Sequence, residues 1–306
     1  MLKAAAYVIG IAVIISFVSR LLAPSYPVHP GGVVLITGAS TGIGRDAAAA
    51  LHSAGYTVFA SVRRQSDADG LKSEFGDRMH PIILDVTSAS DIKSSLGTIQ
   101  EFLSTSRLPF AALVNNAGIP YELPLEFSDP ARVRDLFDVN VFGLMDVTRT
   151  FIPLLRQSKG RIINIGSFAG IFAPRFLSSY SATKFAVSAI SDALRRELAP
   201  HGVSVSEVCP AYVDTPIKGK ASGFGHLTAE QKALYNLDEY ERNLKRFFEK
   251  ADTTAVTSDA ILDAIGNKSP RPRYVVANVD GLPAWVMAKM TWHLPVEIVD
   301  FIERYF

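Results

Sequence analysis

The sequence is poor in the residues that build disulfides, metal sites and nucleic-acid surfaces. Cys209 is the only cysteine among 306 residues, so no disulfide can form within the chain. This cysteine and the six histidines show none of the usual metal-ligand spacings, which argues against a metal enzyme. The net charge is +1 with Lys and Arg scattered, so we expect no nucleic-acid partner. With 48% hydrophobic and 20% charged residues, the chain has the composition of a folded globular protein.

A run without charge lies near the amino terminus. Residues 4–18 contain no charged side chain and stand between Lys3 and Arg20. As a helix they would reach only about 22 Å, short of the ~30 Å hydrocarbon core of a bilayer. Counting residues 2–22, with both cations extended towards the interfaces, closes that gap. We therefore expect residues 1–22 to be a single-pass membrane anchor; a cleaved signal peptide and a packed core helix are the alternatives.

After an irregular Pro/Gly linker over residues 23–32, a glycine-rich loop opens the predicted catalytic domain, residues 33–306. Residues 33–36 are apolar, as in a strand inside a parallel sheet, and residues 45–51 have a helical pattern. A loop between them would cradle a dinucleotide, because glycines allow close approach and the helix amino end faces the pyrophosphate. A tight turn with packing glycines is the alternative. The predicted contacts are Gly38, Ser40, Thr41, Gly42, Ile43 and Gly44.

The next predicted strand, residues 57–62, ends in two arginines. An acidic residue near this point would hold the ribose 2′-hydroxyl of NAD, but the chain has Val62 and then Arg63. A guanidinium can bind a 2′-phosphate with two hydrogen bonds. We therefore predict NADP(H) over NAD(H), with Arg63 the first contact and Arg64 the second. The alternative is that both arginines lie on a solvated loop.

Further strands alternate with helices. Residues 81–84 and 111–114 are predicted strands, followed by Asp85 and by Asn115–Asn116 respectively. Asp85 would accept from the adenine amine or play a local role in its loop, and Gly118 permits close approach to a cofactor. This alternation predicts a doubly wound parallel sheet, a Rossmann-type α/β domain. Ligands bind such sheets at the carboxyl ends of the strands, where these residues fall.

Tyr180 and Lys184 stand at the start of a predicted helix that ends near Leu198. Residues four apart share a helix face, so the phenol and the ammonium project side by side. A neighbouring cation favours the ionised phenol, which suits a general acid/base at an alcohol or carbonyl oxygen. An ordinary amphipathic helix with a chance Tyr and Lys is the alternative.

Two more polar side chains are placed to join this pair. Ser167 ends a predicted strand over residues 160–167, shortly before Tyr180. Asn140 lies in a predicted long helix, residues 132–151, on an apolar stretch where a buried amide needs a partner. The strand-end hydroxyl and the Tyr–Lys pair are therefore expected to converge on one oxygen.

Together these motifs resemble the short-chain dehydrogenase/reductase family over about residues 32–274. They stand in the family's order and at its spacing. The matching positions are Thr37-Gly38-x-x-x-Gly42-x-Gly44, Asp85-Val86, Asn115-Asn116-Ala117-Gly118, Asn140, Ser167, Tyr180-x-x-x-Lys184 and Pro210-x-x-Val213-x-Thr215. Ala211 departs from the pattern, because the family usually has glycine after the proline. The extra methyl group would tighten the nicotinamide pocket.

The resemblance implies a role for each polar residue. Tyr180 would exchange a proton with the substrate oxygen, and Ser167 would orient that oxygen. Lys184 would support Tyr180 and bond the nicotinamide ribose, and Asn140 would hold a water in a proton relay. The resemblance also implies cofactor contacts at Asp85, Val86, Asn116, Ala117, Gly118, Tyr180, Lys184, Pro210, Val213 and Thr215.

The last third of the chain is expected to shape a substrate pocket. Residues 216–250 begin with glycines and continue as an amphipathic helix, which predicts a substrate lid; a solvated helical excursion is the alternative. Residues 253–266 predict a helix, and residues 273–276 the last strand. Residues 282–306 are rich in large apolar side chains. They would form a lipophilic pocket wall, a membrane-surface contact, a homodimer contact or plain packing against the sheet.

The sequence thus predicts a membrane-anchored, NADP(H)-preferring oxidoreductase acting on a secondary alcohol or ketone of a lipophilic substrate. Within the family it looks most like the retinol and hydroxysteroid dehydrogenases, which implies a steroid, retinoid or lipid substrate and the endoplasmic reticulum membrane. One alternative is an NAD-dependent relative acting on a small hydroxy acid or sugar. Another is a catalytically idle dinucleotide-binding scaffold.

Overall fold

The computed structural model describes residues 23–216 and 223–303. The predicted anchor, residues 1–22, lies outside this part of the chain, as do residues 217–222 of the predicted lid and residues 304–306. Among the residues that are described, no helix has both the length and the apolar character to cross a bilayer.

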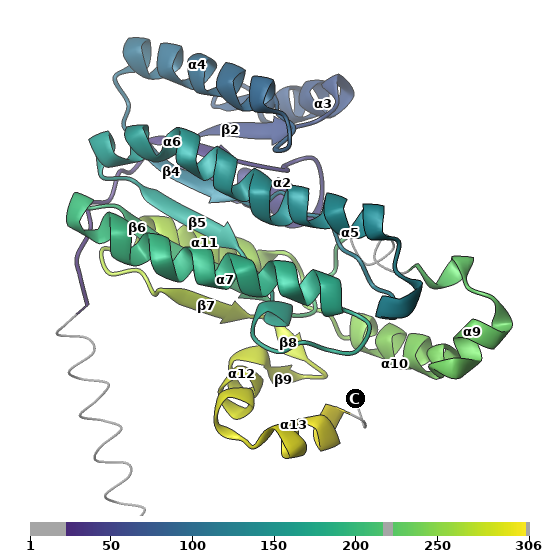
Figure 1. The fold of residues 1–306 in the computed structure, drawn as a ribbon. Helices are drawn as coiled ribbons and strands as arrows, with labels where there is room; N and C mark the ends of the chain where they lie inside the picture. The colour runs from purple at the N-terminus through teal and green to yellow at the C-terminus, as the bar shows by residue number, and fades with distance from the viewer. Residues whose placement is uncertain (1–22, 217–222, 304–306) are drawn as a thin grey trace, which may run out of the picture.

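Seven parallel strands form the central sheet (Figure 1), in the order β3-β2-β1-β4-β5-β6-β7. The predicted doubly wound α/β fold is therefore confirmed. The strands are β1 (Val33–Ile36), β2 (Thr57–Val62), β3 (Met79–Ile83), β4 (Phe110–Asn115), β5 (Arg161–Ile165), β6 (Ser204–Pro210) and β7 (Arg273–Val276). The short strands β8 (Asn278–Val279) and β9 (Leu282–Pro283) pair separately and antiparallel.

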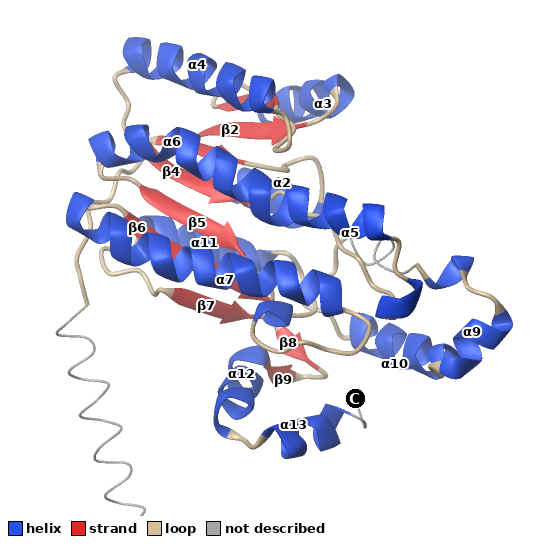
Figure 2. Cartoon of the chain, viewed as in Figure 1, coloured by secondary structure: helices blue, strands red, loops and turns tan. Residues whose placement is uncertain are grey.

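Helices cover both faces of this sheet (Figure 2). Helices α4, α6 and α7 lie on one face, and α2, α3 and α11 lie on the other. These helices are α2 (Gly42–Ser53), α3 (Gln65–Phe75), α4 (Ala89–Ser106), α6 (Leu144–Ser158), α7 (Ser178–Leu198) and α11 (Ala255–Gly266). Beyond the carboxyl ends of the strands lie α5 (Pro130–Phe137), α9 (Ala229–Leu234), α10 (Leu237–Glu249), α12 (Ala284–His293) and α13 (Val296–Glu303).

The two layers arise from the alternation of side chains along each strand. In β1, Val34 and Ile36 join the apolar cluster under α2, α3 and α11. Val33 and Leu35 join the cluster under α4, α6 and α7. Successive side chains of a strand point to opposite faces, so a wholly apolar strand can supply two cores at once.

The predicted long helix over residues 132–151 is instead three helical pieces. Between α5 and α6 the backbone forms a π-helix, η2 (Asp138–Gly143), which contains Asn140. Single π-turns inside helices often mark functional sites. The predicted lid helix is also broken, because Asn236 adopts a left-handed conformation (φ 51°) between α9 and α10. The sequence pattern missed both interruptions, because the apolar period continues through them.

A buried arginine fastens the Pro/Gly linker to the domain. The Arg161 side chain is 1% exposed. Its guanidinium donates to the carbonyls of Ala264 and Asn267 at 2.7 and 2.6 Å, and to that of Pro27 at 2.9 Å. The linker is therefore ordered at this point by a charge-assisted contact with the start of β5.

Candidate active site

A cavity of about 850 Å³ opens at the carboxyl ends of the strands. Parallel α/β sheets bind their ligands at this edge. The cavity is lined by every cofactor contact that the sequence predicts, together with Ser167. Asn140 is the only predicted site residue that does not line it; it lies behind Gly118.

The glycine loop between β1 and α2 has the shape of a phosphate cradle. Gly38 and Gly42 both have positive φ, 69° and 58°, a conformation that other residues rarely adopt. A side-chain carbon added to Gly44 would overlap the Gly38 carbonyl and the Asn116 amide. The absence of a side chain on Gly44 thus lets the loop pack closely against Asn116. The amino end of α2 lines the cavity, as binding of a pyrophosphate requires.

Two residues lock this loop onto β4. The Asn116 amide donates to the carbonyls of Thr37 and Gly38 at 2.9 and 3.0 Å. The Thr37 hydroxyl accepts from the backbone N–H groups of Asn116 and Ala117, both at 3.0 Å. The Asn116 side chain is therefore engaged in shaping the loop, so its predicted cofactor contact would come from the rest of the residue.

At the far end of β2 the two arginines differ. The Arg64 guanidinium makes two hydrogen bonds to the Asp67 carboxylate, at 2.9 and 3.0 Å. Arg63 is exposed, lines the cavity and has no ion pair with any residue in 23–216 or 223–303. Asp85 accepts from the backbone and the hydroxyl of Thr87 at 2.9 and 2.7 Å, a local role in its loop, while still lining the cavity.

The end of β6 forms the opposite wall. Thr215 lies within ordinary contact distance of the side-chain position of Gly42, so this segment closes over the glycine loop. Ala211 is held to β7 by a 3.0 Å hydrogen bond from its N–H to the Val276 carbonyl. Ala211 packs against the apolar cluster beneath α12. The methyl group that stands in place of the family's usual glycine therefore fills space beside this cluster.

Tyr180 and Lys184 lie on the first turns of α7, as predicted. The Lys184 ammonium is 5.7 Å from the centre of the Tyr180 ring and donates to the Ile165 carbonyl at 2.9 Å. Lys184 is 6% exposed. Because an ammonium has three donors, the bond to β5 fixes its position and leaves donors for the cavity.

Ser167 follows β5 and caps the short helix η3 (Phe168–Gly170). Its hydroxyl oxygen accepts from the Ala169 N–H at 3.1 Å, so the hydroxyl proton can be donated elsewhere. A carbon added to Gly170 would overlap the Lys184 carbonyl, so η3 packs directly against α7. This contact holds Ser167 and the Tyr–Lys pair at one edge of the sheet.

Asn140 joins the loop after β4 to α7. Its amide oxygen accepts from the Ile119 N–H at 2.8 Å. Its amide nitrogen donates to the Ile119 carbonyl at 3.0 Å and to the Thr183 hydroxyl at 3.2 Å. The side chain is 2% exposed, and its oxygen lies 3.2 Å from the position of a carbon added to Gly118. The buried amide is thus satisfied by protein partners around Lys184.

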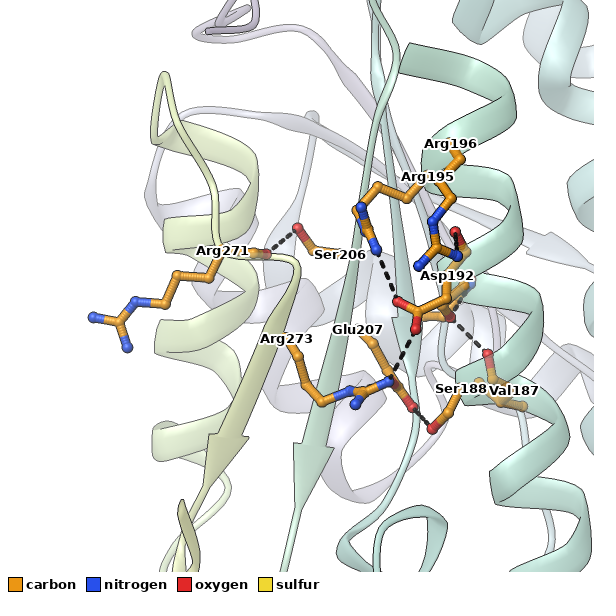
Figure 3. Close-up of polar contacts among 11 residues, drawn as sticks. Val187, Ser188, Asp192, Arg195, Arg196, Ser206, Glu207, Arg271 and Arg273 are labelled. Carbon is orange, nitrogen blue, oxygen red and sulfur yellow. Dashed lines mark hydrogen bonds and ion pairs between the residues drawn. The ribbon is translucent and has the colours of Figure 1, made fainter. Parts of the chain in front are cut away.

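The sequence did not single out a second set of buried polar residues. Glu207 on β6 accepts from the Ser188 hydroxyl at 2.6 Å and from the Arg273 guanidinium at 2.8 Å (Figure 3). Burial, and to a smaller extent the Glu207 carboxylate, raises the pKa of the Cys209 thiol, so this cysteine is a poor nucleophile. Glu207 was missed because a strand pattern does not show which polar residue will be paired across the sheet.

The remaining wall of the cavity is mostly apolar and comes from the carboxyl-terminal third. The described part of the predicted lid contributes Leu244, Phe247 and Phe248 from α10. The predicted apolar segment 282–306 contributes Leu282, Met287, Met290, Leu294 and Val299. Trp285, Trp292 and Val296 of the same segment point outward and are at least half exposed. The segment is therefore both a pocket wall and an exposed apolar surface.

A family model described as short chain dehydrogenase matches residues 32–225. That segment is more than half of the chain and contains the glycine loop, Ser167, Tyr180 and Lys184. The chain therefore belongs to the short-chain dehydrogenase family. The glycine loop, with two glycines at positive φ and the amino end of α2 lining the cavity, fits a nicotinamide dinucleotide cofactor.

Named relatives fall in the same family. The chain is 39% identical over 187 residues to the mitochondrial D-beta-hydroxybutyrate dehydrogenase of Rattus norvegicus, covering 59% of this chain and 54% of that protein. The match thus spans about half the length of that relative. Estradiol 17-beta-dehydrogenase 2 of the same species is 31% identical over 291 residues, covering 89% and 74%. A Burkholderia cenocepacia short chain dehydrogenase, solved with NADP, superposes with a TM-score of 0.66 at 26% identity, covering 86% and 93%.

Proposed function

We propose that the protein interconverts a secondary alcohol and a ketone on a lipophilic substrate, or a retinol-type alcohol and its aldehyde, using NADP(H). The observation that carries this proposal is the cavity itself. Its polar half is built by the glycine loop and the strand ends, and its other half by apolar side chains of α10, α12 and α13. Ser167, Tyr180 and Lys184 line the same cavity.

In this proposal two side chains contact the substrate oxygen, and a third supports them. Tyr180 gives a proton to the carbonyl oxygen during reduction and takes it from the alcohol during oxidation. Ser167 donates its free hydroxyl proton to the same oxygen and orients it. Lys184, fixed by the Ile165 carbonyl, keeps a positive charge beside Tyr180 and offers its remaining donors to the nicotinamide ribose. The bound cofactor supplies or accepts the hydride.

Asn140 has a supporting place in the proposal. Its two amide atoms already bond Ile119 and Thr183, so it fixes the walls around Lys184. A water of the proton relay would therefore use the second lone pair of the amide oxygen or a nearby backbone group.

The preference for NADP(H) rests on Arg63. No carboxylate stands at the end of β2 to bind a ribose 2′-hydroxyl, and Asp67 is neutralised by Arg64. Arg63→Ala should raise KM for NADPH about tenfold to a hundredfold, the loss of a hydrogen bond to a charged group, and leave KM for NADH unchanged. Arg64→Ala is the comparison and should have a smaller effect. A wild-type preference for NADH would refute the assignment.

The similarity to a hydroxybutyrate dehydrogenase raises a small hydroxy acid as a second candidate substrate. Its carboxylate would need a cation in the apolar half of the cavity. Among the described lining residues of that half, the charged group is instead Glu122. An anionic substrate would be repelled there, which favours an uncharged lipophilic molecule.

The central test is NADPH oxidation with a panel of steroid, retinoid and lipid carbonyl compounds, and with small keto acids and sugars as the other arm. Tyr180→Phe should reduce turnover by about two to four orders of magnitude while NADPH still binds. Substantial turnover by this variant would remove Tyr180 from the mechanism. Binding of NADPH without oxidation by any compound would favour an idle scaffold.

We propose further that residues 1–22 anchor the protein in a membrane, from the uncharged run at 4–18. Deleting residues 1–22 should move the protein from the membrane fraction to the supernatant. If the full chain and the truncated chain both remain in the supernatant, the anchor is refuted.

A further inference from the structure

An acidic side chain stands in the apolar half of the cavity. Glu122 follows Gly118 by four residues, in the loop after β4, and is 3% exposed. The Tyr240 hydroxyl, on α10, donates to its Oε1 at 2.6 Å. Both residues line the cavity, although neither belongs to the cofactor half or to the Ser–Tyr–Lys set.

The second carboxyl oxygen of Glu122 has a different environment. Oε2 makes no hydrogen bond to any residue of 23–216 or 223–303. It is not one of the unpartnered polar atoms that are sealed from solvent, so solvent reaches it. Because the residue lines the cavity, this oxygen is an acceptor open to a bound molecule. Solvent reaches this oxygen through the cavity, so a bound molecule that excludes the solvent must supply a donor in its place.

Apolar and aromatic side chains make up much of the surroundings of Glu122. The charged groups nearby are Glu241 and the Arg175 guanidinium, which lies 6.0 Å from the centre of the Tyr240 ring. Leu123, Phe224 and Leu237 form a buried cluster, against which Phe176 and Tyr240 pack. Burial raises the pKa of Glu122 to about 7, with Tyr240 opposing the rise and Glu241 adding to it. The carboxyl group therefore exists in both protonation states near neutral pH. A hydroxyl group matches both, since it can donate to the carboxylate and accept from the acid.

We propose that Glu122, held in place by Tyr240, is a polar subsite that binds a second hydroxyl group of the substrate, away from the carbonyl that reacts. The substrate class is then a lipophilic hydroxyketone, or the corresponding diol in the opposite direction. The inference rests on the proposed function, because it places the reacting carbon at Tyr180.

A purely structural role for Glu122 would have different consequences. The Glu122 carbonyl accepts from the Gly223 N–H at 3.1 Å, and Oε1 accepts from Tyr240, so the residue also fastens the segment that leads to α10. Those contacts need the backbone and one carboxyl oxygen only. A structural role would change stability, whereas a subsite changes the ratio of affinities for two ligands that differ in one hydroxyl.

The test uses calorimetric titration of the full chain, with and without NADP⁺. The ligands are secondary alcohols of increasing chain length and the matching diols with a second hydroxyl at the far end of the chain. For wild type, at least one diol should bind about tenfold to a hundredfold more tightly than its mono-alcohol, the gain expected of a hydrogen bond to a charged group.

Three variants isolate the carboxyl group. Glu122→Gln should reduce the ratio, because the open acceptor becomes an amide donor without charge. Glu122→Leu combined with Tyr240→Phe replaces both partners by apolar groups, which is nearly neutral for folding, and should reverse the preference. Glu126→Gln removes a charge from the same loop outside the cavity and should leave the ratio unchanged.

A ratio near one in wild type at every chain length, or an equal ratio in wild type and the double variant, would overturn the subsite. A preference for a matching amine over the diol would overturn the hydroxyl assignment. These outcomes are independent of turnover, so a chain that prefers diols but oxidises none would retain the subsite and lose the proposed function.

Discussion

The Glu207 carboxylate occupies the space that a side chain on Gly166 would need. A carbon added to Gly166 would overlap Glu207 Oε1. Gly166 is the residue before Ser167, so this contact sets the backbone that presents the predicted catalytic hydroxyl. Figure 3 shows the carboxylate between Ser188 and Arg273, which hold it in this place.

Gly166→Ala should therefore destabilise the protein and impair catalysis together. The new methyl group would displace Glu207 from Arg273, and breaking a buried ion pair costs about 3–5 kcal/mol. Denaturant unfolding measures the loss, and kcat should fall because Ser167 shifts. The matched control is Gly97→Ala on α4, where nothing lies within 4 Å of the added carbon. It should stabilise the helix by about 0.5–1 kcal/mol.

Asn140→Ala should lower both stability and kcat. The change removes partners from the Ile119 N–H and carbonyl and from the Thr183 hydroxyl, and leaving such buried groups unpaired costs about 1–3 kcal/mol each. Thr183→Val removes only one partner of the amide and one bond to the Tyr180 carbonyl, so its loss should be smaller. Thermal unfolding and steady-state rates check both variants. Equal losses of stability and kcat in the two variants would show that the hydrogen bonds of Asn140 to Ile119 contribute nothing beyond its bond to Thr183.

Glu122 predicts a pH dependence of stability. Its pKa is about 7 in the fold against an ordinary 4.5, so the unfolded chain releases this proton first as pH rises. Stability is full below about pH 4.5 and falls as pH rises through about 7, by up to about 3 kcal/mol. Burial dominates this rise; Tyr240 opposes it, and Glu241 adds to it.

Glu122→Gln should remove this pH dependence. The variant should be more stable than wild type above the raised pKa, and the difference should shrink towards low pH. Denaturant midpoints over a pH series measure it. A constant difference between variant and wild type at all pH values would mean that folding does not raise the pKa of Glu122.

Arg161→Met should destabilise the domain by about 3–5 kcal/mol. The substitution leaves the carbonyls of Ala264, Asn267 and Pro27 without their donor inside the protein. Arg156→Met, at an exposed position on α6, is the control and should stay within about 0.5 kcal/mol of wild type. Equal unfolding midpoints for the two variants would contradict the structural role of Arg161.

Much of the fold could be predicted from local sequence patterns. The predicted strands 33–36, 57–62 and 273–276 coincide with β1, β2 and β7. Continuous apolar runs bounded by turn residues predict such strands, because both signals are local in the sequence. The π-helical break around Asn140 could not be predicted from the sequence, because a π-turn depends on the packing around it rather than on the apolar period.

The sequence by itself determined the family, the order of the strands along the chain and the residues that line the cofactor half of the cavity. Each of these rests on a motif of a few neighbouring residues whose geometry is local: a glycine loop, a strand end, one helix turn. Only the tertiary structure decided which buried polar side chains meet. Glu122 reaches Tyr240 across 118 positions and Glu207 reaches Arg273 across 66. Such pairs form because the folded chain buries their side chains together, and no short-range pattern records that.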